Sequence, residues 1–156
     1  MTPAVVLLGQ RKIPHEVISY HHDPEARSYG AEAAEVLRLD PSQVFKTLVA
    51  EVAELGLTVA VVPVSAKLDL KALAKAVDGK KAKMADVDDV ERTTGYVVGG
   101  ISPLGLKKRL PTVIDSSAVD LDQMYVSGGR RGLEVRLAPS DLATLTNATV
   151  ATITKG

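Results

Sequence analysis

The chain has 156 residues, a length that fits one domain, and 46% of them are hydrophobic while only 3% are aromatic, so Val, Leu, Ile and Ala must build the core. It contains no cysteine, which excludes disulfides, thiolate metal sites and a cysteine nucleophile. With 19 basic and 19 acidic residues the formal net charge is zero, which argues against strong sequence-independent binding to nucleic acid.

Apolar periodicity and turn residues predict alternating groups of helices and strands. In chain order we expect a helix at residues 4–8, a strand at 15–20, a helix at 30–39, strands at 44–53 and 57–64, helices at 70–77 and 86–92, strands at 111–115, 124–127 and 133–137, a short helix from 139 and a last strand at 148–153. Because strands often follow one another directly, the pattern predicts a single α/β domain over residues 1–156, with a central mixed, mainly antiparallel sheet surrounded by helices.

Boundary residues support several of these elements. Thr2 followed by Pro3 is typical of a helix N-cap with proline at the first helical position. Asp69 is expected to cap the helix at 70–77, and Gly79 to end it. The continuous run from Ala60 to Val62 is typical of a strand covered on both faces.

Metal, export and membrane signals are weak or missing. The three histidines lie in one short stretch, which argues against an ordinary zinc site. The first residues lack a signal-peptide pattern, and no window approaches the ~20 apolar residues that a membrane span needs. We therefore expect a cytoplasmic protein that uses no metal or cofactor and does not contact a membrane.

The usual catalytic motifs are also missing: there is no Gly-x-Ser-x-Gly elbow, P-loop, His-Glu-x-x-His pair or dinucleotide fingerprint. The segment Gly128-Gly129-Arg130-Arg131-Gly132 lacks the strand–turn–helix context of a dinucleotide site, and we interpret it as a hairpin turn.

The glycine-dense segment Gly99-Gly100-Ile101-Ser102-Pro103 is more informative. Two glycines directly after an expected strand would let the backbone approach a ligand closely, and Pro103 would stiffen the loop. Its N–H groups could hold a carbonyl oxygen or an oxyanion. A tight turn with no ligand explains the same residues.

Lys46 lies inside an apolar strand, where alternation places it on a face with Val44 and Leu48. It either extends to water from a strand edge or lines a pocket, where it would serve as a fixed cation for a phosphate or a carbonyl. Tyr20 suits either a pocket mouth or the edge of a core. For Glu134, alternation alone predicts an outward side chain.

Taken in order, these segments resemble the YbaK family of aminoacyl-tRNA deacylases, which is related to the editing domain inserted in bacterial prolyl-tRNA synthetases. The similarity covers nearly the whole chain. Its strongest stretch runs from Thr94 to Gly105 and is followed by Lys107 to Pro111, while Gln43 to Leu48 and Tyr125 to Gly129 also agree.

The resemblance implies a partly barrel-like sheet and a pocket formed by a strand lysine and a Gly-x-x-x-Pro loop. Glu134 would belong to this pocket, at a position where the best-known relative carries aspartate. The catalytic set implied in this chain is Lys46, Gly99, Gly100, Ile101, Ser102 and Pro103, and the substrate-binding set is Tyr20, Phe45, Thr47 and Glu134.

The implied activity is removal of cysteine from mischarged tRNA(Pro), with aminoacyl-tRNA and prolyl-tRNA synthetase as partners. Because an aminoacyl ester is already activated, the cysteine thiol of the substrate could attack its own carbonyl if the protein held it in position. Two alternatives stay open: a deacylase for tRNA mischarged with serine or alanine, and a non-catalytic module that binds tRNA ends or nucleotides.

Overall fold

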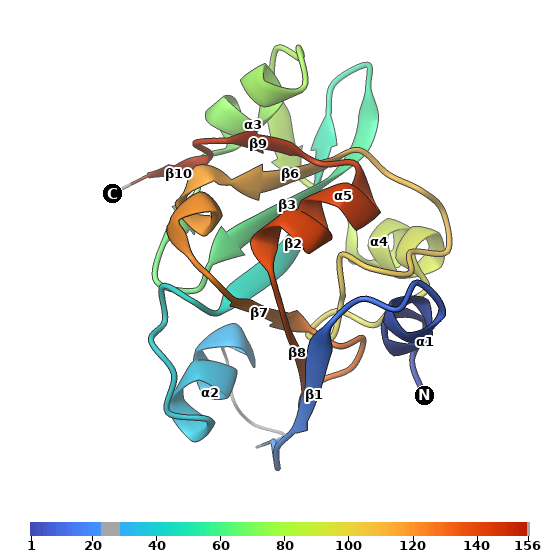
Figure 1. Cartoon of the computed structure of the whole chain (residues 1–156). Helices are drawn as coiled ribbons and strands as arrows, with labels where there is room; N and C mark the ends of the chain where they lie inside the picture. Colours follow the sequence, from blue (N-terminus) through green and yellow to red (C-terminus); the bar gives the residue numbers. More distant parts are fainter. Residues whose placement is uncertain (23–28, 156) are drawn as a thin grey trace.

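The computed structural model describes residues 1–22 and 29–155, arranged as strands in three sheets with helices around them (Figure 1). The strands are β1 (His15–Ser19), β2 (Phe45–Val52), β3 (Gly56–Pro63), β4 (Lys67–Leu68), β5 (Ala82–Met84), β6 (Thr112–Asp115), β7 (Met124–Ser127), β8 (Leu133–Leu137), β9 (Thr149–Ala151) and β10 (Thr154–Lys155). The helices are α1 (Pro3–Gln10), α2 (Tyr29–Val36), α3 (Leu70–Ala76), α4 (Val87–Thr94), α5 (Pro139–Thr146) and the 3₁₀ helix η1 (Ser116–Asp120).

The predicted α/β class is confirmed, and each expected helix and strand named by range is present within a few residues. The expected caps are also present: the Thr2 side chain accepts from the Val5 N–H, and the Asp69 side chain accepts from the Lys71 and Ala72 N–H groups. Four short elements were not predicted, namely β4, β5, β10 and η1. Each has at most five residues, too few to show a periodic pattern.

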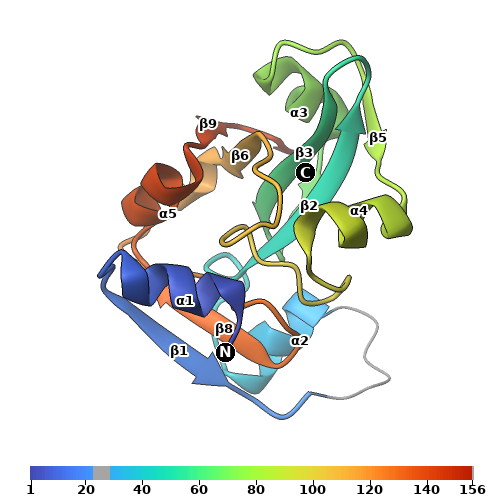
Figure 2. The same cartoon turned by 90° about the vertical axis from the view of Figure 1, so that its right-hand side faces the viewer.

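The largest sheet has the strand order β5-β2-β3-β6-β9. β2 and β3 form the predicted antiparallel hairpin, while β3–β6 and β6–β9 are parallel. Residues 59–62 of β3 are fully buried, as the apolar run predicted. α3 packs on one face of this sheet, where Leu73 joins a cluster with Ala60 and Val62 (Figure 2).

The second sheet is antiparallel with the order β1-β8-β7, and the two sheets meet at a corner. There an isolated parallel bridge joins Val44 to Tyr125, and the Tyr125 N–H donates to the Gln43 carbonyl at 3.0 Å. The arrangement is partly barrel-like at this corner, although no barrel closes within the described residues. The corner places the start of β2 beside the β7–β8 hairpin.

One local expectation was wrong, because Val97 and Val98 do not form a strand before the glycines. α4 ends at Thr94, its C-cap residue Gly95 adopts a left-handed conformation, and the chain then continues as a loop. Tyr96 is buried and its hydroxyl donates to the Leu104 carbonyl at 2.6 Å. The Val97 side chain is 71% exposed, so this β-branched residue belongs to a loop at the surface and not to a strand.

Residues at the start of α1 contact both the β7–β8 turn and the loop that follows α4. The Thr2 hydroxyl donates to the Gly128 carbonyl. A Cβ on Gly105, whose φ is +68°, would lie 2.7 Å from the Pro3 carbonyl carbon, so only glycine lets the loop approach α1 this closely.

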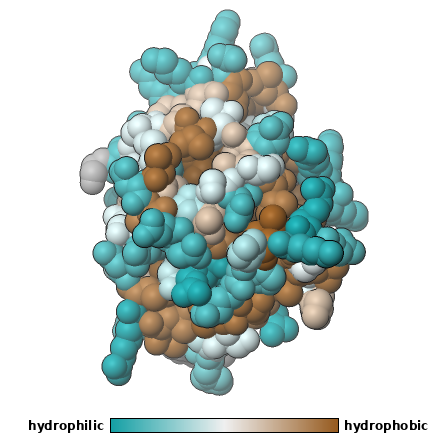
Figure 3. All heavy atoms as spheres, viewed as in Figure 1, coloured by the Kyte–Doolittle hydropathy of each residue, from teal (hydrophilic) through white to brown (hydrophobic). Residues whose placement is uncertain are grey.

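The surface seen in Figure 3 mixes hydrophilic and apolar side chains, with hydrophilic ones standing out at the top of the view, where α3 lies in Figure 1. No helix in the described part of the chain is long and apolar enough to cross a membrane.

Candidate active site at the open edge of β2

A pocket with a cavity volume of 290 Å³ lies where β2 leaves one edge unpaired. β3 pairs with β2 over its whole length, whereas β5 pairs with it only over residues 50–52. Residues 45–49 all line the pocket, whose other walls come from the end of β5, α4, the loop after α4 and the β7–β8 hairpin. Side chains from both faces of one strand can therefore reach a single ligand at this edge.

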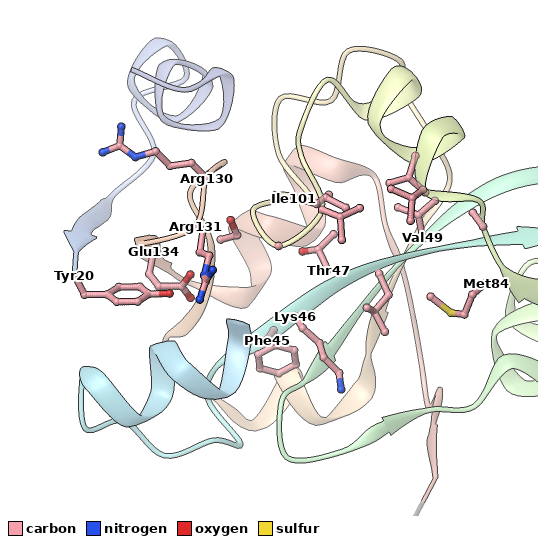
Figure 4. A pocket seen from close by; sticks show the side chains of 17 residues that line it. Tyr20, Phe45, Lys46, Thr47, Val49, Met84, Ile101, Arg130, Arg131 and Glu134 are labelled. Carbon is pink, nitrogen blue, oxygen red and sulfur yellow. The ribbon is translucent and has the colours of Figure 1, made fainter. Parts of the chain in front are cut away.

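Lys46 lines this pocket from one face of β2. Burial lowers the pKa of its ammonium, and the nearby positive charge of Lys67 lowers it further. In Figure 4 the ammonium extends to the opposite side of β2 from Thr47 and Ile101. Lys46 and the glycine loop thus line the same cavity, as expected, but the charge of Lys46 lies to one side of it.

Thr47 lies on the other face of β2 and contributes a hydroxyl oxygen that is buried and has no hydrogen-bond partner within the described residues. A buried hydroxyl without a partner costs free energy, on the order of 1–3 kcal/mol. A polar group of a ligand in the pocket would offset this cost by supplying the missing partner.

The loop after α4 contributes Val98, Gly99 and Ile101 to the pocket wall. Gly99 has a φ of +100°, which favours glycine. The Gly100 N–H donates to the Val97 carbonyl at 2.9 Å, which closes a turn. Within residues 1–22 and 29–155, the N–H groups of Gly99 and Ile101 donate to no other group. Because Gly99 and Ile101 line the pocket, their N–H groups are candidate donors to a ligand bound there.

Gly100 does not line the pocket and lies against the β7–β8 turn. A Cβ at this position would lie 2.6 Å from the Arg130 Cα and 2.7 Å from the Arg131 N. The missing side chain therefore lets the two backbones touch. This contact fixes the loop against the hairpin that carries the opposite pocket wall.

At the other end of the pocket, Tyr20, Arg131 and Glu134 lie together (Figure 4). Tyr20 follows β1, and its N–H donates to the Gly132 carbonyl at 2.9 Å. Arg131 forms an ion pair with Glu32 of α2 at 3.4 Å, and the two side chains are only 17% and 9% exposed. Arg130, by contrast, points away from this group in Figure 4.

Glu134 is 6% exposed, so the outward orientation expected from alternation was wrong. β8 is the central strand of its sheet, and Leu133, Glu134 and Val135 are all buried. Burial raises the pKa of Glu134 to about 8, so this carboxyl is mostly protonated at pH 7 and can donate a hydrogen bond. The pKa of Tyr20 is also raised, first by burial and then by the charge of Glu134.

The structure brings together most, but not all, of the residues singled out from the sequence. Those that line the pocket are Tyr20, Phe45, Lys46, Thr47, Gly99, Ile101 and Glu134. Gly100, Ser102 and Pro103 do not line it. Ser102 is fully buried and its hydroxyl accepts from the Leu104 N–H at 3.2 Å, while Pro103 lines a separate cavity beside α1. The last three residues shape the loop rather than face the pocket.

Sequence reasoning missed the other pocket residues, namely Leu48, Val49, Met84, Ala85, Val87, Val90, Val98, Ser127, Arg130 and Arg131. The apolar ones come from β2, the end of β5 and the residue after it, α4 and the loop after α4, and their side chains carry no chemical signature. The Arg131 signal was available, because the turn predicted at Gly128 to Gly132 directly precedes the strand of Glu134. No group of three or more metal-ligating side chains exists in the described part of the chain.

A family model described as an aminoacyl-tRNA editing domain matches residues 23–145. A curated relative from Enterococcus faecalis, EbsC, named as a candidate Cys-tRNA(Pro)/Cys-tRNA(Cys) deacylase, is 39% identical over 153 residues; the match covers 98% of this chain and 93% of the relative.

Solved structures show the same architecture. One, described as a candidate trans-editing enzyme for prolyl-tRNA synthetase, is 25% identical with a TM-score of 0.83, and the match covers 100% of this chain and 99% of the other. Another, a hypothetical protein, is 24% identical with a TM-score of 0.87 over 98% of this chain and 99% of the other, and it supports the fold alone.

Proposed function

Because the chain belongs to the aminoacyl-tRNA editing domain family, we propose that it is a trans-acting deacylase that removes cysteine from mischarged tRNA(Pro). The observation that carries this proposal is the set of unpartnered polar groups at the open edge of β2. Thr47, whose hydroxyl has no partner within the described residues, lines one small cavity together with Gly99 and Ile101, whose N–H groups have no acceptor there. Its 290 Å³ lies at the lower end of small-molecule pockets, about 300–1,000 Å³, which suits an aminoacyl group and its sugar.

The pocket is built to position a substrate rather than to attack it. None of the described lining residues is a histidine or a cysteine, and the Ser127 hydroxyl accepts from the Gly129 N–H at 3.1 Å. This composition supports a reaction in which the substrate supplies the nucleophile. Holding the thiol against the ester would give the attack a high effective molarity.

In this reaction the cysteine sulfur bonds to the ester carbonyl carbon and the bond from that carbon to the ribose oxygen breaks. The ribose oxygen takes up the thiol proton, and the released thiolactone then hydrolyses to cysteine. We assign stabilisation of the carbonyl oxygen to the Gly99 and Ile101 N–H groups, because the Gly100 N–H is already used within the loop. Tyr20, Phe45, Thr47 and Glu134 are the proposed substrate-binding residues. Proline, which has no thiol, would be spared.

We also propose prolyl-tRNA synthetase as a partner in the cytoplasm, where translation occurs. The formal net charge of zero supports only weak contact with the body of a tRNA. Selection of tRNA(Pro) would then come through the synthetase that holds it.

The test is deacylation of cysteinyl-, alanyl-, seryl- and prolyl-tRNA(Pro) by the purified protein, with thiolactone separated from free cysteine. We expect rapid cleavage of the cysteinyl ester alone, with thiolactone as the first product. Equal rates on alanyl-tRNA would indicate attack by water instead, and binding without turnover on any substrate would indicate a non-catalytic module.

The Lys46→Ala variant should lose deacylation while remaining folded, because Lys46 supplies the positive charge at the pocket edge. Lys71→Ala is the matched control, since Lys71 is an exposed lysine on α3 that lines no pocket found in the described residues. Full turnover by Lys46→Ala would exclude the assigned role.

A further inference from the structure

Two lysines that the proposed reaction does not use face each other beside the pocket. β4 and β10 pair antiparallel, with Lys67 directly opposite Lys155 and Leu68 opposite Thr154. Like charges directly opposite one another destabilise a strand pair, and only two residue pairs form this ladder. The pairing of Lys67 with Lys155 therefore does not stabilise the two strands, and we looked for a binding role for the two charges.

Hydrogen bonds of the buried residue Ile153 hold this strand pair in place, so the backbone that carries the two lysines is fixed. Ile153 is fully buried, and its N–H donates to the Asp115 carboxylate at 3.0 Å. Its carbonyl accepts from the Asp69 N–H at 2.7 Å. Leu68 packs against a core cluster, so alternation projects Lys67 and Lys155 from the other face of the ribbon, toward solvent.

The ladder also adjoins the pocket lysine. The chain reverses after β3 through a turn in which the Ala66 N–H donates to the Pro63 carbonyl at 3.1 Å, and this turn returns Lys67 to the neighbourhood of Lys46. The charge of Lys67 is felt at the Lys46 ammonium, which extends away from the glycine loop (Figure 4). Lys67 thus lies near the pocket lysine, and Lys155 lies opposite Lys67 in the strand pair.

In the part of the chain that the structure describes, no carboxylate is paired with these lysines. Within residues 1–22 and 29–155, none of the three lysines takes part in an ion pair. The two acidic side chains next to the ladder accept from backbone N–H groups: Asp69 caps α3, and Asp115 accepts from the Ser117 and Ile153 N–H groups. The site therefore has an excess of positive charge, although the whole chain is neutral.

We propose that Lys67 and Lys155 extend the Lys46 edge of the pocket into a binding site for the phosphodiester backbone immediately 5′ of the terminal nucleoside of the RNA substrate. This inference rests on the proposed function, which places the aminoacyl ester at the glycine loop. A cavity of 290 Å³ cannot also hold the preceding nucleotides, so the backbone must leave it. Lys46, Lys67 and Lys155, which we call the lysine track, offer this negatively charged backbone a positively charged path.

The test uses a 5′-fluorescein single-stranded RNA octamer ending in CCA, with binding followed by anisotropy at several salt concentrations. The double variant Lys67→Gln/Lys155→Gln should bind about 3- to 10-fold more weakly than the unaltered protein at low salt. The slope of log K against log salt should become shallower by about 0.7 for each phosphate that a lysine no longer neutralises. The matched control is Lys80→Gln/Lys81→Gln, which removes two exposed lysines that line no described pocket.

The Lys67→Gln/Lys155→Gln variant should unfold at the same temperature as the unaltered protein or at a higher one, because it removes a like-charge pair. Equal losses of affinity in the variant and the control, or an unchanged salt slope in the variant, would overturn the proposal.

Turnover separates this inference from the proposed function. Deacylation of cysteinyl-tRNA(Pro) that is identical in the variant and the unaltered protein, KM included, would refute the lysine track and leave the function standing. Lysine-dependent RNA binding without turnover in the unaltered protein would refute the function and leave the site standing.

Discussion

Replacing Glu134 with glutamine should stabilise the protein at alkaline pH and leave it almost unchanged in acid. The pKa of this 6% exposed carboxyl rises from its ordinary value of 4.5 to about 8. Ionising it therefore costs roughly 4–5 kcal/mol more in the folded state than in the unfolded chain, at about 1.4 kcal/mol per pH unit. The glutamine side chain avoids this cost because it has no charge to bury.

The sign follows from proton binding. Between pH 4.5 and 8 the folded state keeps the Glu134 proton while the unfolded state releases it, so the stability present below pH 4.5 is lost as the pH rises through 8. The difference in unfolding free energy between Glu134→Gln and the unaltered protein should thus grow by about 3–4 kcal/mol from pH 5 to pH 9. Charged neighbours of this group, Arg131 and Glu32, are present in both proteins.

Urea unfolding at each pH unit from 5 to 9 would measure this difference for Glu134→Gln and for Glu35→Gln, an exposed glutamate on α2. Only the first variant should show the pH-dependent gain. A gap between Glu134→Gln and the unaltered protein that is the same at pH 5 and pH 9 would mean that Glu134 is not buried as an uncharged carboxyl, and the reasoning would fail.

Other substitutions separate stability from function. Thr47→Val should raise the free energy of unfolding by about 1 kcal/mol, because it removes an unpartnered buried hydroxyl, yet lower kcat/KM for deacylation; unchanged kinetics would show that the hydroxyl binds no substrate. Gly100→Ala should lower stability by about 1–3 kcal/mol, since its Cβ would lie 2.6 Å from the Arg130 Cα. Gly9→Ala in α1, where a Cβ meets nothing within 4 Å, should instead raise stability by about 0.5–1 kcal/mol in thermal unfolding; a decrease there would contradict the packing argument.

Local sequence patterns were sufficient to predict the longer helices and strands. The apolar run at residues 59–62, the Thr2-Pro3 start of α1 and the Asp69 cap each depend on near neighbours in sequence, and each is present in the structure. The short strands β4, β5 and β10 depend on distant partners: β10 exists because Ile153 is held by Asp115 and by the backbone of Asp69. No window of sequence contains that information.

The pocket was harder to predict for the same reason. Lys46 could be singled out because a lysine interrupts an apolar strand. Glu134 could not be placed by alternation, since its burial comes from the central position of β8 and from the covering of both its faces. The segment around Val97 reads as a strand by composition, but Gly95 ends α4 in a left-handed turn and no strand lies beside it.

The pairing of β1 with β8 limits how early during synthesis this part of the chain can fold. His15 aligns with Leu137 and Ser19 with Leu133, so the strand that leads to Tyr20 stays without its described sheet partner until most of the chain has been synthesised. Such long-range pairing slows folding, because a large loop must close before the contact forms. The pocket wall that combines Tyr20 with Glu134 can therefore form only after β8 has been synthesised.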